Sequence, residues 1–104
     1  MGHRLVYVTA PSAEEAERLG RLAVESRLAA CANIIPGMRS VYWWQGKLES
    51  ADETVLLLKT TAALVGELTQ ALTDAHSYDC PCVVSLSIEG GNPAFLKWIE
   101  DETR

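Results

Sequence analysis

Two short segments of this chain are apolar at almost every position and have the residue types of β-strands. Residues 5–9 read Leu-Val-Tyr-Val-Thr, and residues 55–58 read Val-Leu-Leu-Leu. Because successive side chains of a strand point to opposite faces of a sheet, such segments need cover on both faces. A chain of 104 residues has room for one core. We therefore expect residues 1–104 to form one domain whose helices cover one face of the sheet, while something else covers the other face.

The remaining patterns give the order of the elements. Strands are predicted at residues 5–9, 32–45, 48–60 and 81–88, with helices from Ser12 to about residue 28, from Thr61 to about residue 76 and from Asn92 to about residue 102. The turn at residues 45–47 joins the two long strands in a hairpin, since Gly46 supplies a positive φ. The order βαββαβ with a terminal helix predicts an α+β, ferredoxin-like fold: two helices on one face of a four-stranded antiparallel sheet.

Three aromatic residues in a row lie next to the hairpin turn. Tyr42 and Trp44 point to one side of an extended strand and Trp43 to the other, so the helices of one sheet cannot bury all three. Copies of the same sheet are the simplest cover for a chain with no second domain, so we expect an oligomer with Tyr42, Trp43 and Trp44 at its interface. The alternative is that Trp43 packs under the terminal helix, while the other two rings form a half-exposed rim.

Composition excludes several classes of function. Nine basic and fourteen acidic residues give a net charge of −5, without any basic stretch, which argues against a nucleic-acid partner. No apolar run approaches the length needed to cross a membrane, and no secretion signal is present, so we expect a cytoplasmic protein without a membrane partner. No phosphate loop or catalytic triad pattern appears, and we predict that the chain is not an enzyme and has no organic cofactor.

Metal-binding residue types cluster in one segment. His76, Cys80 and Cys82 offer one imidazole and two thiols within seven residues, and such soft ligands favour copper(I) or zinc. The alternative is structural: the two cysteines are small buried hydrophobes, and His76 caps the end of its helix. Cys31, the third cysteine, lies in an alanine-rich segment and is expected in the core. The odd number of cysteines predicts free thiols rather than a disulfide framework.

A second hypothesis concerns a cleft between subunits. Lys59 ends a strongly apolar strand, where a cation at a subunit seam could meet an anion. Tyr78 and Trp44 could form the walls of such a cleft. The protein would then sense a small molecule or anion and signal to a partner, or act as a scaffold.

Several segments together resemble the CutA divalent-cation-tolerance family. They lie in order and at compatible spacing over essentially the whole chain: residues 9–11, 28–37, 41–47, 59–61, 76–78 and 91–92, with Trp98. The resemblance implies a compact homotrimer of ferredoxin-like subunits, similar in architecture to trimers of the PII type. It also implies a role in tolerance of copper and other divalent metals, so copper or another divalent ion is the expected metal partner.

The chain departs from this family at positions associated with copper. Bacterial members similar to this chain are thought to hold copper through a cysteine before Thr-Ala-Pro and through paired histidines before Pro-Tyr. Here Val8 and Ala75 occupy two of those places, and only His76 is kept. Ser77 stands where the family usually has proline, and Cys82 where it usually has glutamate. The family's copper site therefore does not transfer intact to this sequence.

Overall fold

The elements follow the predicted order. The computed structural model describes residues 2–104, and Met1 lies outside the described residues. Its elements are β1 (His3–Ala10), α1 (Ala13–Glu25), β2 (Cys31–Trp44), β3 (Lys47–Thr61), a 3-10 turn (Ala62–Leu64), α2 (Val65–Ala75), β4 (Val83–Ile88) and α3 (Pro93–Glu102). The class is α+β, as predicted.

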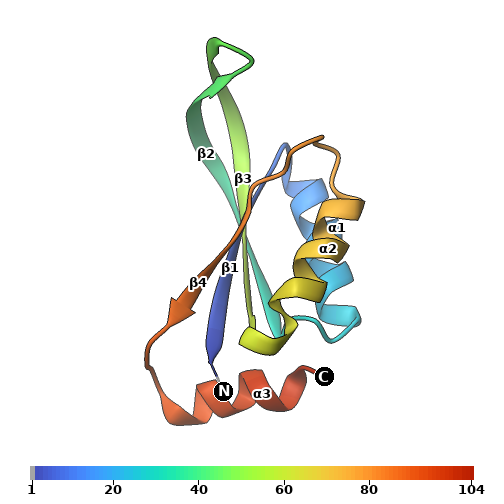
Figure 1. Ribbon diagram of the computed structural model, residues 1–104, viewed down its shortest axis with the longest axis vertical. Coiled ribbons are helices and arrows are strands. Elements are labelled where there is room, and N and C mark those ends of the chain that lie inside the picture. The colour runs from blue at the N-terminus through green and yellow to red at the C-terminus, as the bar shows by residue number, and fades with distance from the viewer. Residues whose placement is uncertain (1) are drawn as a thin grey trace.

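The four strands form one antiparallel sheet in the order β2-β3-β1-β4. The register places Tyr7 between Leu57 on β3 and Val84 on β4. This strand order is that of the ferredoxin-like arrangement. Figure 1 shows α1 and α2 side by side on one face of the sheet, with α3 across the end opposite the hairpin tip. The long β2-β3 hairpin extends beyond the helices and lengthens the molecule to 44 Å.

The core lies between the sheet and α1 and α2. Its fully buried side chains include alternate residues of β1 and β3, packed against the apolar faces of the helices: Val6, Val8, Leu56, Leu58, Leu19, Leu68 and Leu72. The alternation means that the intervening residues face the other side of the sheet. That second face is open in the single chain: Ile35, Val84 and Leu86 are each about half exposed, at 48%, 50% and 50%.

The helix and turn signals in the sequence are mostly confirmed. The Ser12 hydroxyl accepts a hydrogen bond from the Glu15 backbone N–H at 3.1 Å, and Asn92 caps α3 in the same way through Ala94. The hairpin turn has positive φ at both Gln45 and Gly46, the geometry of a two-residue turn between twisted strands.

Two helix boundaries differ from the prediction. α1 ends at Glu25 rather than near residue 28, because Arg27 adopts a left-handed conformation with φ of 63° and reverses the chain. The side chain of Thr61 caps no helix, and a 3-10 turn precedes α2. The Thr61 backbone is extended, as at a helix N-cap, but its hydroxyl makes no capping hydrogen bond, and α2 begins only at Val65.

Candidate functional site

A pocket of about 780 Å³ lies between the hairpin and the segment that joins α2 to β4. Two kinds of segment line it: residues 38–42 with Trp44 and Glu53 from the hairpin, and residues 77–80 with Cys82 from the joining segment; Tyr7 and Thr9 of β1 contribute from the open face of the sheet. It therefore brings together residues far apart in the sequence.

The aromatic residues of the hairpin divide between two surfaces. Tyr42 and Trp44 line the pocket and are 41% and 45% exposed. Trp43 points the other way, as strand alternation requires, and is 73% exposed beside its cross-strand partner Leu48 at 62%. The alternative in which Trp43 packs under the terminal helix is therefore wrong for the single chain.

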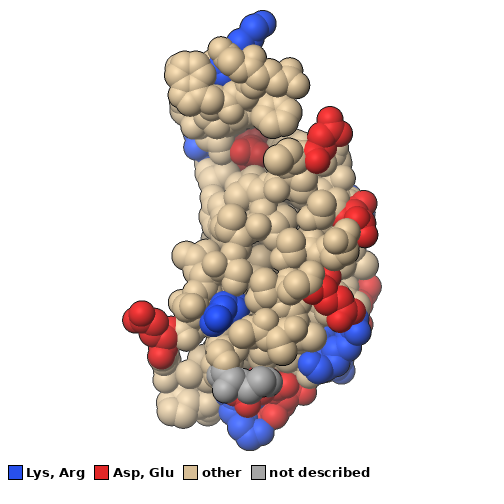
Figure 2. Space-filling model, in the orientation of Figure 1, with Lys and Arg blue, Asp and Glu red and all other residues tan. Residues whose placement is uncertain are grey.

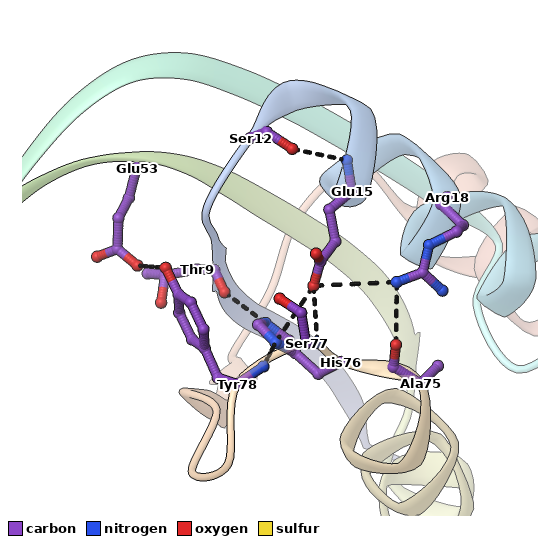
Figure 3. Close-up of polar contacts among 9 residues, drawn as sticks. All are labelled: Thr9, Ser12, Glu15, Arg18, Glu53, Ala75, His76, Ser77 and Tyr78. Atoms are coloured by element: carbon purple, nitrogen blue, oxygen red, sulfur yellow. Dashed lines mark hydrogen bonds and ion pairs between the residues drawn. The ribbon is translucent and has the colours of Figure 1, made fainter.

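Tyr78 is held against the hairpin by a carboxylate. Its hydroxyl donates to Glu53 Oε2 at 2.8 Å, as Figure 3 shows. Burial, and then the hydrogen bond to Glu53 and its negative charge, raise the pKa of the Tyr78 phenol far above its ordinary value. The phenol therefore stays a neutral donor and fixes one oxygen of Glu53 at the pocket wall.

His76 lies behind Tyr78 and is used by the protein itself. Its side chain is fully buried, Nε2 donates to the Thr9 carbonyl at 2.8 Å, and Nδ1 accepts from the Tyr78 N–H at 3.1 Å (Figure 3). Neither ring nitrogen keeps a free lone pair for a metal ion. The predicted capping of the α2 carbonyls is not what is found, since the ring reaches across to β1 instead.

The two cysteines of the predicted metal site line the pocket, but without His76. Cys80 is exposed and Cys82 half-buried, so neither is the fully buried small hydrophobe of the structural alternative. Burial and the charge of Glu53 raise the pKa of the Cys82 thiol, while Thr9 opposes this shift. Within residues 2–104, no three His, Cys, Asp or Glu side chains are placed to hold one metal ion. Of the three ligands predicted from the sequence, Cys80 and Cys82 thus share one pocket, whereas both ring nitrogens of His76 are already hydrogen-bonded within the protein.

Lys59 lies in a different part of the open face. Its Nζ donates to Asn33 Oδ1 at 2.7 Å, is 3.6 Å from Cys31 Sγ and sits 5.8 Å from the centre of the Phe95 ring. Lys59 lies six positions after Glu53 on β3, or about 20 Å along an extended strand. In the single chain, Trp44 and Tyr78 therefore share the pocket without Lys59. Cys31 is partly exposed beside this lysine rather than fully buried.

Glu53 and Met38, both at the pocket, were not singled out from the sequence. The two are cross-strand partners in the hairpin, and Met38 Sδ accepts a hydrogen bond from the Tyr7 hydroxyl at 3.3 Å. A charged residue within a long strand is ordinarily a solvated one, and only the β2-β3 register reveals that Glu53 faces the joining segment. A hairpin register counted back from the turn at Gly46 pairs Met38 with Glu53, because the bulge between residues 35 and 38 lies beyond this pair.

The sequence comparisons all point to the same protein family. The family model described as "CutA1 divalent ion tolerance protein" matches residues 4–102. "Protein CutA 1, chloroplastic" of Oryza sativa subsp. japonica is 44% identical over 96% of this chain, and the chain spans 56% of that relative's length. "Divalent-cation tolerance protein CutA" of Archaeoglobus fulgidus is 42% identical over 95% of this chain and 96% of its own length.

Solved structures agree with this result. The crystal structure of CutA1 from Oryza sativa superposes with a TM-score of 0.96 at 42% identity, covering 100% of this chain and 95% of that one. The divalent cation tolerance protein of Thermus thermophilus gives a TM-score of 0.95 at 39% identity, covering 98% and 99% of the two chains. The whole arrangement of sheet, hairpin and terminal helix is therefore shared.

Proposed function

Because this chain belongs to the CutA1 divalent ion tolerance family, we propose that it works as a homotrimer that binds metal ions, with copper as the first candidate. The relatives' names speak of divalent-cation tolerance, not of a reaction, and the proposal contains no catalytic step. The chain spans only about half the length of its plant relatives, so activity and partners are proposed for this chain on its own residues.

The open apolar face of the sheet carries the trimer proposal. Ile35, Val84 and Leu86 are half exposed there, and Trp43 and Leu48 are exposed on the opposite side of the hairpin. Exposed apolar surface of this kind on a single chain is typical of an interface. A neighbouring copy presents the same chemistry, and three copies around one axis would turn the open faces toward one another. Tyr42 and Trp44 would then lie beside the seam, close to the pocket.

The two pocket thiols carry the metal proposal. Cys80 and Cys82 are two residues apart, both line the pocket, and thiolates favour copper(I) or zinc over harder ions. His76 would join them only by giving up its bonds to Thr9 and Tyr78, so we assign it to positioning the segment. A water molecule or a neighbouring subunit would complete the coordination. Since burial keeps the Cys82 thiol protonated, metal binding should release protons.

The metal proposal is tested by titrating copper(I) and zinc into the reduced protein by calorimetry with a competing chelator. The double variant Cys80→Ser, Cys82→Ser should lose at least about a hundredfold in affinity, since the soft ligands are removed. Cys31→Ser is the matched control, because Cys31 lies beside Lys59, outside the pocket, and it should bind as the unchanged protein does. Equal affinity in all three proteins would contradict the proposal.

A small-molecule sensor of the PII type is the second candidate, and the pocket volume favours it. A cavity of about 780 Å³ lies in the size range of small-ligand sites. Lys59 would reach such a ligand only from another subunit. Nucleotide binding to the assembled protein that is lost in Lys59→Ala would support this candidate. Nucleotide binding that is unchanged in Lys59→Ala would show that the lysine does not contact the ligand.

The proposed location is the cytoplasm. Among residues 2–104, the helices are too short and too polar to cross a membrane. Relatives are named chloroplastic in plants and periplasmic in Archaeoglobus fulgidus, so the family's members differ in location. Fractionation of the source cells, with detection of the native chain, tests the proposal directly.

A further inference from the structure

We propose that His76 is a proton switch: its neutral ring holds the segment that joins α2 to β4, and protonation of the ring frees this segment from Tyr78 onward. The His76 side chain is fully buried in the single chain, and its hydrogen-bond partners belong to the same subunit. Assembly of copies therefore does not need to change the contacts of the ring. The proposal depends on these buried contacts and not on which surface of the sheet is exposed.

Two backbone groups fix the charge and the tautomer of the His76 ring. Nε2 lies 2.8 Å from the Thr9 carbonyl oxygen, which can only accept, so Nε2 carries a hydrogen. Nδ1 lies 3.1 Å from the Tyr78 backbone nitrogen, whose N–H can only donate, so Nδ1 must offer a lone pair. The neutral Nε2–H tautomer satisfies both partners, which Figure 3 shows on either side of the ring. A protonated ring would set its Nδ1–H against the Tyr78 N–H, and the two donors would have to separate.

A second acceptor lies beside Nδ1 of His76. Oε2 of Glu15 is 3.4 Å from this nitrogen and already accepts the Ser77 backbone N–H at 2.9 Å. Burial raises the pKa of the Glu15 carboxyl, but the Ser77 hydrogen bonds and the charge of Arg18 bring it below its ordinary value of 4.5. The carboxylate therefore stays ionised in the range where histidines change charge. A charged ring would be drawn to Glu15 at the expense of its bond to Tyr78.

The other charged and titratable groups around the ring keep their charge in this range. The Tyr78 ring centre is 4.7 Å from that of His76, and the phenol stays neutral because burial and the Glu53 hydrogen bond raise its pKa far above its ordinary value. From α1, Arg18 lies 3.9 Å from the Glu15 carboxylate and stays positive. The contact from β1 is an uncharged backbone carbonyl. Figure 2 shows acidic side chains along the helical side of the molecule, and the net charge is −5, so the wider field favours a positive ring.

Freeing this segment would move one wall of the pocket and the two proposed metal ligands. Tyr78 reaches Glu53 on the hairpin, and Cys80 and Cys82 follow it in the chain. The consequence for metal rests on the proposed function: displaced thiols should bind the ion more weakly in mild acid than competition by protons at sulfur alone predicts. The switch itself needs no metal, and it is tested without one.

The test follows His76 and Tyr78 by NMR on the assembled, reduced protein in the presence of EDTA. At about pH 8 the ring nitrogen shifts should be those of the neutral Nε2–H tautomer, and they should move to protonated values by about pH 5. Over the same range the protection of the Tyr78 amide against hydrogen exchange, corrected for the intrinsic pH dependence, should fall at least about tenfold. The Leu56 amide in the middle of the sheet should keep its protection, which would show that the change is local. A ring that stays neutral throughout, or a Tyr78 amide that stays protected beside a charged ring, would overturn the proposal.

Variants then assign the effect to this histidine. His76→Gln offers a donor and an acceptor but does not titrate, so the protection of the Tyr78 amide should lose its pH dependence. His3→Gln is the matched control, because His3 is the other histidine of the chain and pairs with Glu100 of α3, and it should leave the response unchanged. A response that persists in His76→Gln, or one that disappears in His3→Gln, would contradict the proposal. Because EDTA is present throughout, a negative result leaves the copper titration untouched, and the reverse also holds.

Discussion

At the scale of single residues, the pocket depends on how the segment after α2 is anchored. Glu15 belongs by sequence to a capping box, yet its carboxylate accepts the Ser77 backbone N–H at 2.9 Å instead of closing the box. The His76 ring continues this anchor to β1 through Thr9, and Arg18 donates to the Ala75 carbonyl at 3.0 Å (Figure 3). These bonds set the position from which Tyr78 reaches the hairpin.

Removing the charge of Glu15 should destabilise the protein in a pH-dependent way. Burial alone raises the pKa of this carboxyl, but the Ser77 hydrogen bonds and the nearby Arg18 lower it below its ordinary value of 4.5 overall. The stabilisation is therefore complete above pH 4.5 and is lost as pH falls through the lowered value. Glu15→Gln should cost about 1 to 2 kcal/mol at pH 7, measured by denaturant unfolding at fixed protein concentration, and the difference should shrink in acid.

Glu14→Gln is the control for this prediction. Glu14 is an exposed carboxylate in the same first turn of α1, so both substitutions remove one charge near the helix N-terminus. It should have much the smaller effect. Equal losses for the two variants would mean that the helix dipole, and not the Ser77 contact, explains the result.

At the scale of elements, the close approach of α1 to the sheet is fixed by one glycine. A Cβ atom at Gly20 would lie 2.9 Å from the Ala32 Cβ and 3.2 Å from Leu56 Cδ1. Glycine within a helix lowers helix propensity by up to about 1 kcal/mol relative to alanine. Its presence here is explained by packing, since both neighbours lie on strands of the sheet against which α1 packs.

Gly20→Ala should therefore destabilise the protein although it improves helix propensity. We expect overpacking to cost about 1 to 3 kcal/mol, which outweighs the propensity gain. Gly66→Ala in α2 is the matched control: no atom lies within 4 Å of its added Cβ, so it should be neutral or stabilising. Thermal midpoints at one protein concentration measure both, and a higher midpoint for Gly20→Ala would contradict this view of the α1–sheet contact.

Element order was predictable from this sequence, whereas the composition of the site was only half predictable. Strand and helix periods, the Ser12 and Asn92 caps and the Gly46 turn are local signals, and they gave the ferredoxin-like order correctly. The site differs from the prediction because of tertiary contacts. Lys59 and Tyr78 lie in separate regions, and His76 is hydrogen-bonded to Thr9 of β1. Which strand residue faces which loop depends on register, and spacing along the chain does not reveal the bulge between residues 35 and 38 or the pairing of β1 with β3 and β4.

At the scale of the whole molecule, the sheet has one covered face and one open face. The helices bury Val6, Val8, Leu56 and Leu58 completely, while apolar residues on the other side remain half exposed. At roughly 25 cal/mol per Å² of apolar surface removed from water, covering such a face strongly favours association. The proposed trimer follows from this imbalance, and its hairpins would extend the contact.

The outer side of the hairpin should matter for assembly. Trp43→Ser removes a ring that is 73% exposed in the single chain, so it should barely change subunit folding but should weaken association and produce smaller species at low micromolar concentration. Leu22→Ser is the control, because Leu22 is an exposed apolar residue on the helical side, away from the open face, and should leave the assembly intact. Sedimentation velocity compares the two; equal behaviour would place the hairpin outside the interface.

The mass of the unmodified protein in solution tests the central claim most directly. Light scattering coupled to size exclusion at micromolar concentration should give three times the 11.4 kDa mass of the chain. The expected particle hides its open sheet faces inside, so the mass should persist in high salt, where charge pairs weaken and apolar contacts do not. A stable species of 11.4 kDa under these conditions would show that the exposed face of the sheet needs no partner, and would contradict the account.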